Sequence, residues 1–259
     1  MNERRVRVIV GTSGWWYDHW QGIFYPPEME PRDWFYHYTR SFDTVEVNSS
    51  FYRLPFENMV KGWAKKAPED FTFTLKMWRR VTHLKKLKDV AKDLEIFFNR
   101  IKPLKPCLGA ILYQLPPSLK IDLGLLEKFL KTLPENLDQA VEFRHKSWLV
   151  EDTFSLLTKY NLAYCIISMP GFPELVRITS DISYIRFHGR EILYGSSYSE
   201  EELVGWADKI LDFFNQGVKR VYVYFNNDYN AYAVFNALRL KELLPPLLPL
   251  DHRPRRPSP

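Results

Sequence analysis

Polar side chains recur at the ends of short β-rich segments of this sequence. Glu142 and Arg144 end one such segment, and Arg186 and His188 end another. Successive side chains of a strand point to opposite faces, so residues two apart share a face. A carboxylate and a histidine on one face can exchange protons with a ligand, whereas arginine forks suit phosphate or carboxylate groups. These spacings predict a polar site where strands end.

One set of alternating strand positions carries the polar residues, and the other set is apolar. The first set comprises Glu46, Asn48, Thr74, Lys76, Leu112, Gln114, Glu142, Arg144, Ile166, Ser168, Arg186, His188, Tyr224 and Asn226. The second set comprises Val45, Val47, Phe73, Leu75, Tyr113, Leu115, Val141, Phe143, Ile185, Phe187, Val223 and Phe225. We expect the apolar set to pack under helices and the first set to point into a barrel. Because burying an unpaired charge is costly, charges that converge there indicate a ligand site.

The elements that must position these residues alternate along the chain. β-rich segments occupy 6–12, 44–48, 71–77, 108–115, 139–144, 163–168, 182–188 and 221–226. Helical patterns occupy 31–39, 57–66, 89–101, 123–133, 152–160, 200–216 and 231–243. The sixth connection, MPGFPELVRITS, is too short and too rich in proline and glycine for a full helix. The alternation predicts a TIM-type (β/α)8 barrel with a degenerate sixth helix, whose active site would lie at the C-terminal strand ends.

Length alone allows either two small domains or one barrel, and the pattern favours one. We expect a single barrel domain over residues 1–244 and a proline-rich basic tail over 245–259. Ser199 with Glu202 predicts a helix capping box, and Pro31 suits a first helical turn.

Composition excludes several classes of protein. Hydrophobic residues make up 46% of the 259 residues, which is ample for a core and rules out a disordered chain. No apolar run is long enough for a signal peptide or a membrane span, so we expect a cytoplasmic protein without a membrane partner. The net charge of +5 mildly favours acidic partners such as nucleic acid. Cys107 and Cys165 sit in apolar runs and are interpreted as buried thiols.

Ordered motifs along almost the whole chain resemble a known family. The runs GTSGWWY, VEVNSSFYRLP, FTLKMWRRVTH, LYQLPPSL, VEFRHKSW, IRFHGR and VYFNND are similar to those of the YecE-like proteins, a prokaryotic family of domains of unknown function. The resemblance implies a TIM-type barrel but brings no substrate or reaction. Its motif positions in this chain are Gly14, Trp15, Glu46, Asn48, Tyr52, Lys76, Gln114, Glu142, Arg144, Trp148, Arg186, His188, Gly189, Asn226 and Asn227.

Cationic candidates at the strand ends outnumber acidic ones. The cationic set is Arg53, Lys76, Arg79, Arg80, Arg144, His145, Arg186, His188 and Arg190, and the acidic set is Glu46, Glu142 and Asp228. This excess predicts a site for a phosphorylated ligand, either a small molecule or a nucleic-acid strand, and phosphodiester hydrolysis is the leading hypothesis for a reaction. The expected binding residues are Trp15, Asn48, Tyr52, Lys76, Gln114, Arg144, Arg186, Asn226 and Asp228.

In that hypothesis Glu46 or Glu142 activates water and His188 acts as acid or base. A single Mg²⁺ or Mn²⁺ held by Glu46, Glu142 or Asp228 is one candidate cofactor, and a reaction without metal is the other.

Two other functions remain open, as do structural interpretations of single residues. A glycosidase could use Glu46 and Glu142 as its carboxylate pair, and a non-enzymatic module could bind nucleic acid or a phosphorylated metabolite at the same mouth. Glu142 and Arg144 could instead form an internal ion pair. Trp15 and its aromatic neighbours could belong to the core of the first loop. The sequence does not predict an oligomeric state.

Overall fold

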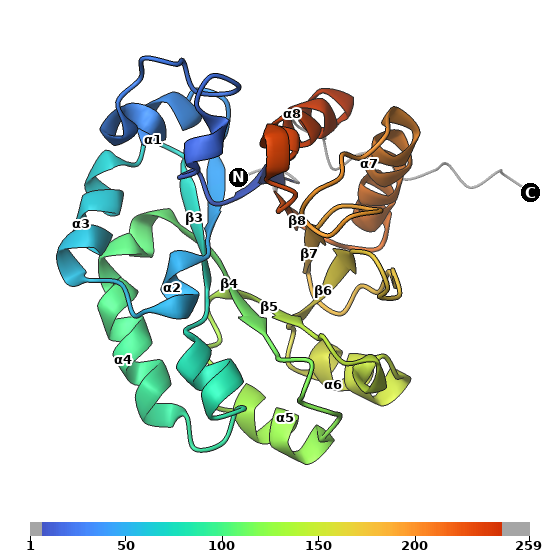
Figure 1. The fold of residues 1–259 in the computed structure, drawn as a ribbon. Helices are drawn as coiled ribbons and strands as arrows, with labels where there is room; N and C mark the ends of the chain where they lie inside the picture. Colours follow the sequence, from blue (N-terminus) through green and yellow to red (C-terminus); the bar gives the residue numbers. More distant parts are fainter. Residues whose placement is uncertain (1–6, 245–259) are drawn as a thin grey trace, which may run out of the picture.

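The computed structural model describes residues 7–244, and eight parallel strands form a closed barrel at its centre (Figure 1). β8 returns to pair with β1, which closes the ring. The strands are β1 (Arg7–Ser13), β2 (Thr44–Val47), β3 (Thr72–Lys76), β4 (Leu108–Gln114), β5 (Asp138–Glu142), β6 (Ala163–Ser168), β7 (Ile182–Phe187) and β8 (Arg220–Phe225). The predicted TIM-type barrel is confirmed. The expected tail, 245–259, lies outside the described residues.

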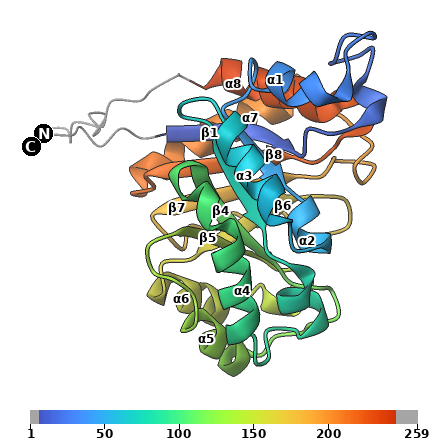
Figure 2. The same ribbon diagram turned by 90° about the vertical axis from the view of Figure 1, so that its left-hand side faces the viewer.

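Helices surround the strands, as Figures 1 and 2 show, and Figure 2 displays α3 and α4 over the side that faces the viewer. They are α1 (Trp34–Tyr38), α2 (Ser49–Tyr52), α3 (Glu57–Lys66), α4 (Ala91–Ile101), α5 (Leu123–Leu130), α6 (Glu151–Lys159), α7 (Glu200–Asn215) and α8 (Tyr232–Leu243). Within the described part of the chain, no helix joins β6 to β7, as predicted. The predicted capping box of Ser199 and Glu202 begins α7. Pro31 is the first residue of the 3-10 turn Pro31–Asp33, which leads into α1.

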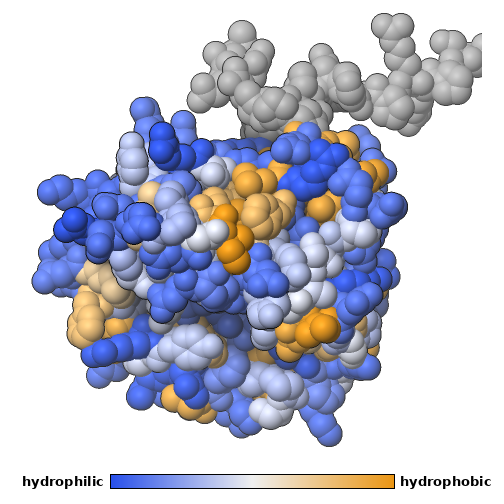
Figure 3. Space-filling model, turned by 45° about the horizontal axis from the view of Figure 1, so that its top comes forward, coloured by the Kyte–Doolittle hydropathy of each residue, from blue (hydrophilic) through white to orange (hydrophobic). Residues whose placement is uncertain are grey.

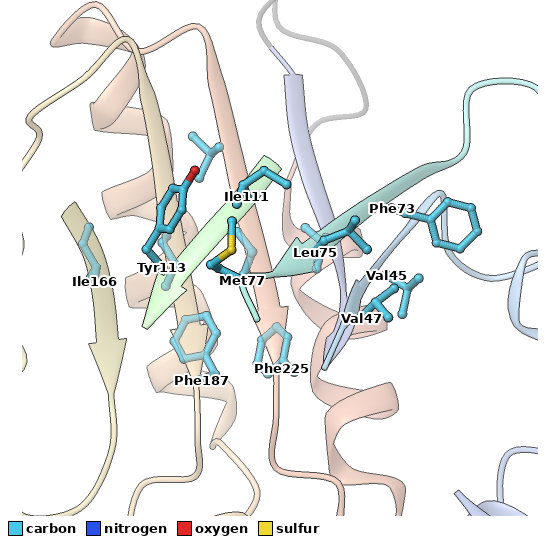
Figure 4. Packing of buried hydrophobic residues seen from close by; sticks show 14 of the residues in the cluster. Val45, Val47, Phe73, Leu75, Met77, Ile111, Tyr113, Ile166, Phe187 and Phe225 are labelled. Carbon is cyan, nitrogen blue, oxygen red and sulfur yellow. The ribbon is translucent and has the colours of Figure 1, made fainter. Parts of the chain in front are cut away.

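Two apolar layers line the strands, one outside the barrel and one inside it. Figure 4 shows part of the outer layer, in which Phe73, Ile111 and Phe187 pack where the helices cover the sheet. The inner layer is the second hydrophobic cluster, and it comprises Ile9, Ala110, Leu112, Ala140, Ala163, Cys165, Ile167, Ile182, Tyr184, Tyr222 and Tyr224. The predicted alternation therefore holds for most strands.

The prediction of which β6 side chains face inward is wrong by one residue. Ile166, expected inside with Ser168, belongs to the outer layer, while Cys165 and Ile167 point inward. The run AYCIIS is buried on both faces, as is usual in a parallel strand, so its apolar pattern does not mark which face is which. Cys165 is a free, buried thiol as expected, and Cys107 is half-buried.

Hydroxyl groups link the strands inside the barrel below the charged ends. The Tyr224 hydroxyl on β8 lies 2.8 Å from the Thr44 hydroxyl on β2 and 2.7 Å from that of Thr74 on β3. These contacts tie β8 to β2 and β3, which are not its neighbours in the sheet, beneath the site.

The surface is mostly hydrophilic on the face that Figure 3 shows, with small separate apolar patches. Over residues 7–244, every helix is too short or too polar to cross a bilayer.

Candidate functional site

Arg186 lies at the centre of a buried ion-pair network at the C-terminal ends of the strands. Its side chain, at the end of β7, is 1% exposed. One guanidinium nitrogen donates to Glu46 Oε1 at 2.7 Å, and the other donates to Glu142 Oε2 at 2.6 Å. Both glutamates are fully buried. A single guanidinium therefore bridges carboxylates from β2 and β5 across the barrel mouth.

Further donors fill the remaining positions on the two carboxylates. Glu46 accepts hydrogen bonds from the Ser13 hydroxyl at 2.7 Å and from the Tyr184 hydroxyl at 2.6 Å. Glu142 Oε1 accepts from the Gln114 amide at 2.8 Å and from Arg144 Nε. Each carboxylate oxygen thus already accepts at least one hydrogen bond, so a divalent cation bound here would have to compete with these donors. The described residues contain no cluster of three His, Cys, Asp or Glu side chains that could hold a metal.

The network is ionised. Burial alone would raise the pKa of Glu142, but the Arg144 and Arg186 guanidiniums hold it well below its usual range. Burial would likewise lower the pKa of Arg186, and Glu46 and Glu142 raise it well above its usual value. Two guanidiniums and two carboxylates therefore balance each other's charge.

His188, just past β7, is a neutral hydrogen-bond acceptor in this network. Its Nε2 lies 3.1 Å from a terminal nitrogen of Arg144 and 3.5 Å from one of Arg186. Because a guanidinium can only donate, Nε2 accepts, and the single proton of the neutral ring sits on Nδ1. Nδ1 lies 3.1 Å from the Asn226 side-chain amide, which must turn its oxygen toward that proton. Burial and the two arginines lower the pKa of His188 well below its usual value.

A cavity of about 690 Å³ opens above the network. Of the residues predicted to bind a ligand, those that line it are Asn48, Tyr52, Lys76, Gln114, Arg144, Arg186, Asn226 and Asp228. Three predicted catalytic residues, Glu46, Glu142 and His188, are fully buried and are not among the lining residues. Trp15 lies elsewhere, with its ring edge-on to Phe35, Trp63 and Phe73, as the alternative of a core position predicts.

The structure adds lining residues that the strand pattern did not indicate. They are Tyr17, Phe51, His83, Pro117, Met169, Phe172 and Tyr194, and Arg79, one of the expected cationic candidates, lines the cavity as well. Phe51 belongs to α2 and His83 to a five-residue π-turn, and both elements are too short to show a helical period. Their positions in the sequence could have indicated them, because each follows directly after a strand, and the loops after the strands form the active-site face of such a barrel. Burial, and then the neighbouring Lys76 charge, lower the pKa of His83 to about 4.

Lys76, the last residue of β3, reaches this cavity without an acidic partner. Its side chain is 8% exposed, and its Nζ lies 4.2 Å from the centroid of the Phe51 ring. Across residues 7–244, no carboxylate forms an ion pair with it, because Glu46 and Glu142 pair with the arginines. Burial, and then the charge of Arg186, lower the pKa of Lys76 to about 8.

Two buried polar atoms of cavity residues have no hydrogen-bond partner in the described structure. They are Asn48 Oδ1 and Arg186 Nε. Buried polar groups are nearly always satisfied, so these two atoms are unusual, and both are buried beneath the cavity surface.

Fold and site together define a single-barrel α/β protein with a charged, ligand-sized cavity at the C-terminal ends of its strands. The family described as "Protein of unknown function DUF72" matches residues 9–257, and the chain belongs to this family. The resemblance inferred from the motifs is confirmed.

Related proteins agree with this assignment. The chain is 28% identical to the UPF0759 protein YunF of Bacillus subtilis, over 92% of this chain and 94% of that protein. The structure is similar to that of a DUF72 family protein, TM1631, from Thermotoga maritima, with a TM-score of 0.82, 35% identity, and coverage of 91% and 98% of the two chains. It also shares its fold with a DUF72 family protein of Enterococcus faecalis, with a TM-score of 0.79, 21% identity, and coverage of 92% and 95%.

Proposed function

We propose that the cavity at the barrel mouth binds a small phosphorylated ligand. The observation that carries the proposal is Lys76, a cation that is 8% exposed, lines the cavity and has no acidic partner among the described residues. Charged side chains are rarely buried without a partner, and an anion arriving from solution would supply one.

The charges around the cavity support an anionic ligand. Arg144 and Arg186 are balanced by the two glutamates beneath them, so the uncompensated cations of the lining are Lys76 and Arg79. Among the described lining residues Asp228 is the one carboxylate, so it offsets only one of these two cations. The lining is therefore cationic on balance.

The volume of the cavity favours a small molecule. About 690 Å³ lies within the usual range for metabolite pockets, roughly 300–1,000 Å³. A nucleotide fits such a volume. A nucleic-acid strand would have to present one nucleotide at a time.

Catalysis by the glutamates has weaker support than binding. Phosphodiester hydrolysis assigned Glu46 or Glu142 to water activation, yet both carboxylates are saturated with donors and do not line the cavity. A glycosidase needs a sugar between its two carboxylates, and here the Arg186 guanidinium occupies that position.

Titration calorimetry with inorganic phosphate, a mononucleotide, a single-stranded oligonucleotide and a neutral monosaccharide tests the proposal. We expect the phosphate compounds to bind, with affinity that falls as salt rises. Arg79→Met should weaken binding roughly tenfold, because it removes a charged hydrogen-bond donor from an exposed position. Lys61→Met, on the exposed face of α3, is the matched control and should bind like wild type.

Salt-independent binding of the monosaccharide, or an Arg79→Met affinity equal to wild type, would contradict the proposal. Tighter binding of the oligonucleotide than of the mononucleotide would favour a nucleic-acid module. Hydrolysis of labelled oligonucleotides that is lost in Glu142→Gln would restore the nuclease hypothesis.

A further inference from the structure

The amine of Lys76 is the one buried basic group of the cavity that the ion-pair network does not use. Arg144 and Arg186 each donate to a glutamate, whereas the Lys76 Nζ faces the Phe51 ring at 4.2 Å. It ends β3, and the C-terminal strand ends are where a barrel of this type presents reactive groups. An amine in this position is open to a ligand in the cavity.

We propose that Lys76 is a nucleophile that forms an imine with a phosphorylated aldehyde or ketone. The inference rests on the proposed function, because contacts from Arg79 to the phosphate would bring the carbonyl carbon to the amine. Lys76 then contacts the reacting carbon, and Arg79 holds the other end of the ligand.

The surroundings of Lys76 favour the neutral amine that such a reaction needs. Desolvation and neighbouring cations are the usual means of activating a lysine. Lys76 has both, since its side chain is 8% exposed and the Arg186 charge opposes its protonation, an effect that Glu142 and Glu46 offset only in part. Its pKa of about 8 means that, at pH 7, the neutral fraction is roughly 200-fold larger than for an ordinary lysine.

The step balances without an oxidant or a reductant. The Nζ lone pair adds to the carbonyl carbon and gives a carbinolamine. The former carbonyl oxygen leaves as water, with one hydrogen from the amine and one proton taken up from solvent. The product is a protonated imine, and one water is released for each imine formed. Borohydride then delivers a hydride to the imine carbon and makes a stable secondary amine.

Borohydride trapping of the full-length protein tests the proposal. Wild type is incubated at neutral pH with dihydroxyacetone phosphate or with dihydroxyacetone, reduced, and analysed by intact-mass and peptide mass spectrometry. We expect a single adduct on the peptide that contains Lys76. Lys76→Arg keeps the charge and removes the neutral amine, so it should lose the adduct. Lys61→Met should behave like wild type.

A second probe makes the test independent of the choice of ketone. Reductive methylation with formaldehyde at pH 7 reacts through neutral amines, and Lys76 should react on the order of tenfold faster than surface lysines. A Lys76 rate no higher than that of surface lysines would overturn the proposal, and so would a trapped adduct that persists in Lys76→Arg.

Failure of the proposed function gives a different result. If Lys76 is trapped equally by both ketones, and inorganic phosphate does not bind, the imine survives and the phosphate site is refuted. If phosphate binds and Lys76 is unreactive toward formaldehyde, the phosphate site survives and the imine is refuted.

Discussion

Removing Arg186 should be among the most destabilising single changes at the barrel mouth. Arg186→Met keeps much of the side-chain volume but leaves Glu46 and Glu142 buried without their shared cation. Removing one partner of a buried ion pair typically costs about 3–5 kcal/mol. Glu142 keeps Arg144 and Gln114, and Glu46 keeps two hydroxyl donors, so we expect a loss in the free energy of unfolding within that range.

The pH dependence of this loss separates electrostatics from packing. In wild type the depressed pKa of Glu142 contributes stability that is present above the unfolded value of about 4.3 and is lost as pH falls through the folded value. Without Arg186, the folded pKa of Glu142 should rise, because one guanidinium fewer then opposes the effect of burial. Protonation of Glu142 then costs the folded variant less than it costs wild type, and the deficit of the variant should shrink as pH falls from about 8 to about 4.

Urea unfolding followed by circular dichroism across that pH range measures both effects. Glu46→Gln added to Arg186→Met should recover more than about 1 kcal/mol, because one buried charge is gone. Arg239 also bridges two glutamates, Glu200 and Glu242, but at the surface, so Arg239→Met is a matched control with a much smaller expected loss. An Arg186→Met loss below about 1 kcal/mol, or a loss that does not change with pH, would refute the reasoning.

Three further changes test other parts of the structure. Because the pKa of His188 is depressed in the folded protein, its contribution to the free energy of unfolding is present above about pH 6.5 and falls by about 1.4 kcal/mol per pH unit below it. In urea unfolding, the free energy of unfolding of His188→Gln should therefore depend less steeply on pH than that of wild type, and His83→Gln makes the same comparison at a second histidine whose pKa is lowered. Tyr224→Phe removes one partner from each of two buried threonine hydroxyls, which keep their hydrogen bonds to the Thr72 carbonyl and the Ala110 N–H, so it should lower the free energy of unfolding by about 0.5–1.5 kcal/mol, whereas an unchanged urea midpoint would contradict this bond. Gly189 has a φ of +93°, and an added Cβ would lie 2.4 Å from the Ile192 carbonyl oxygen, so Gly189→Ala should lower the thermal unfolding midpoint clearly, and a neutral result would count against this turn.

The sequence predicts the barrel well because alternation and connection lengths are local properties. Polar residues on one face of β2, β5 and β7 revealed which side faces inward, and that part of the prediction is confirmed. On β6 both faces are apolar, and the same reasoning assigned Ile166 to the wrong side. Local pattern can predict a face only where the two faces differ.

Ion pairs between residues that are distant in the sequence could not be predicted from local patterns. Arg186 meets Glu46 and Glu142, which lie 140 and 44 positions away on strands that are not its neighbours. Only closure of the barrel brings the three together. A count of charged residues therefore treated Arg186 and Arg144 as available to a ligand, although the structure balances both with carboxylates.

This pairing changes which residue we interpret as the reactive group of the cavity. Two glutamates and a histidine resemble catalytic groups in the sequence, but in the folded chain the carboxylates are saturated and the histidine accepts from a guanidinium. A buried ion-pair network is a poor source of stability, and its better-supported role is to specify positions. Here it holds Arg144 and Arg186 beneath the cavity, while burial is the main cause that lowers the pKa of Lys76. Glu46 and Glu142 partly offset the two arginines at this amine, so Arg144→Met, which leaves both glutamates in place, should raise the pKa of Lys76 and lower the rate at which Lys76 is methylated.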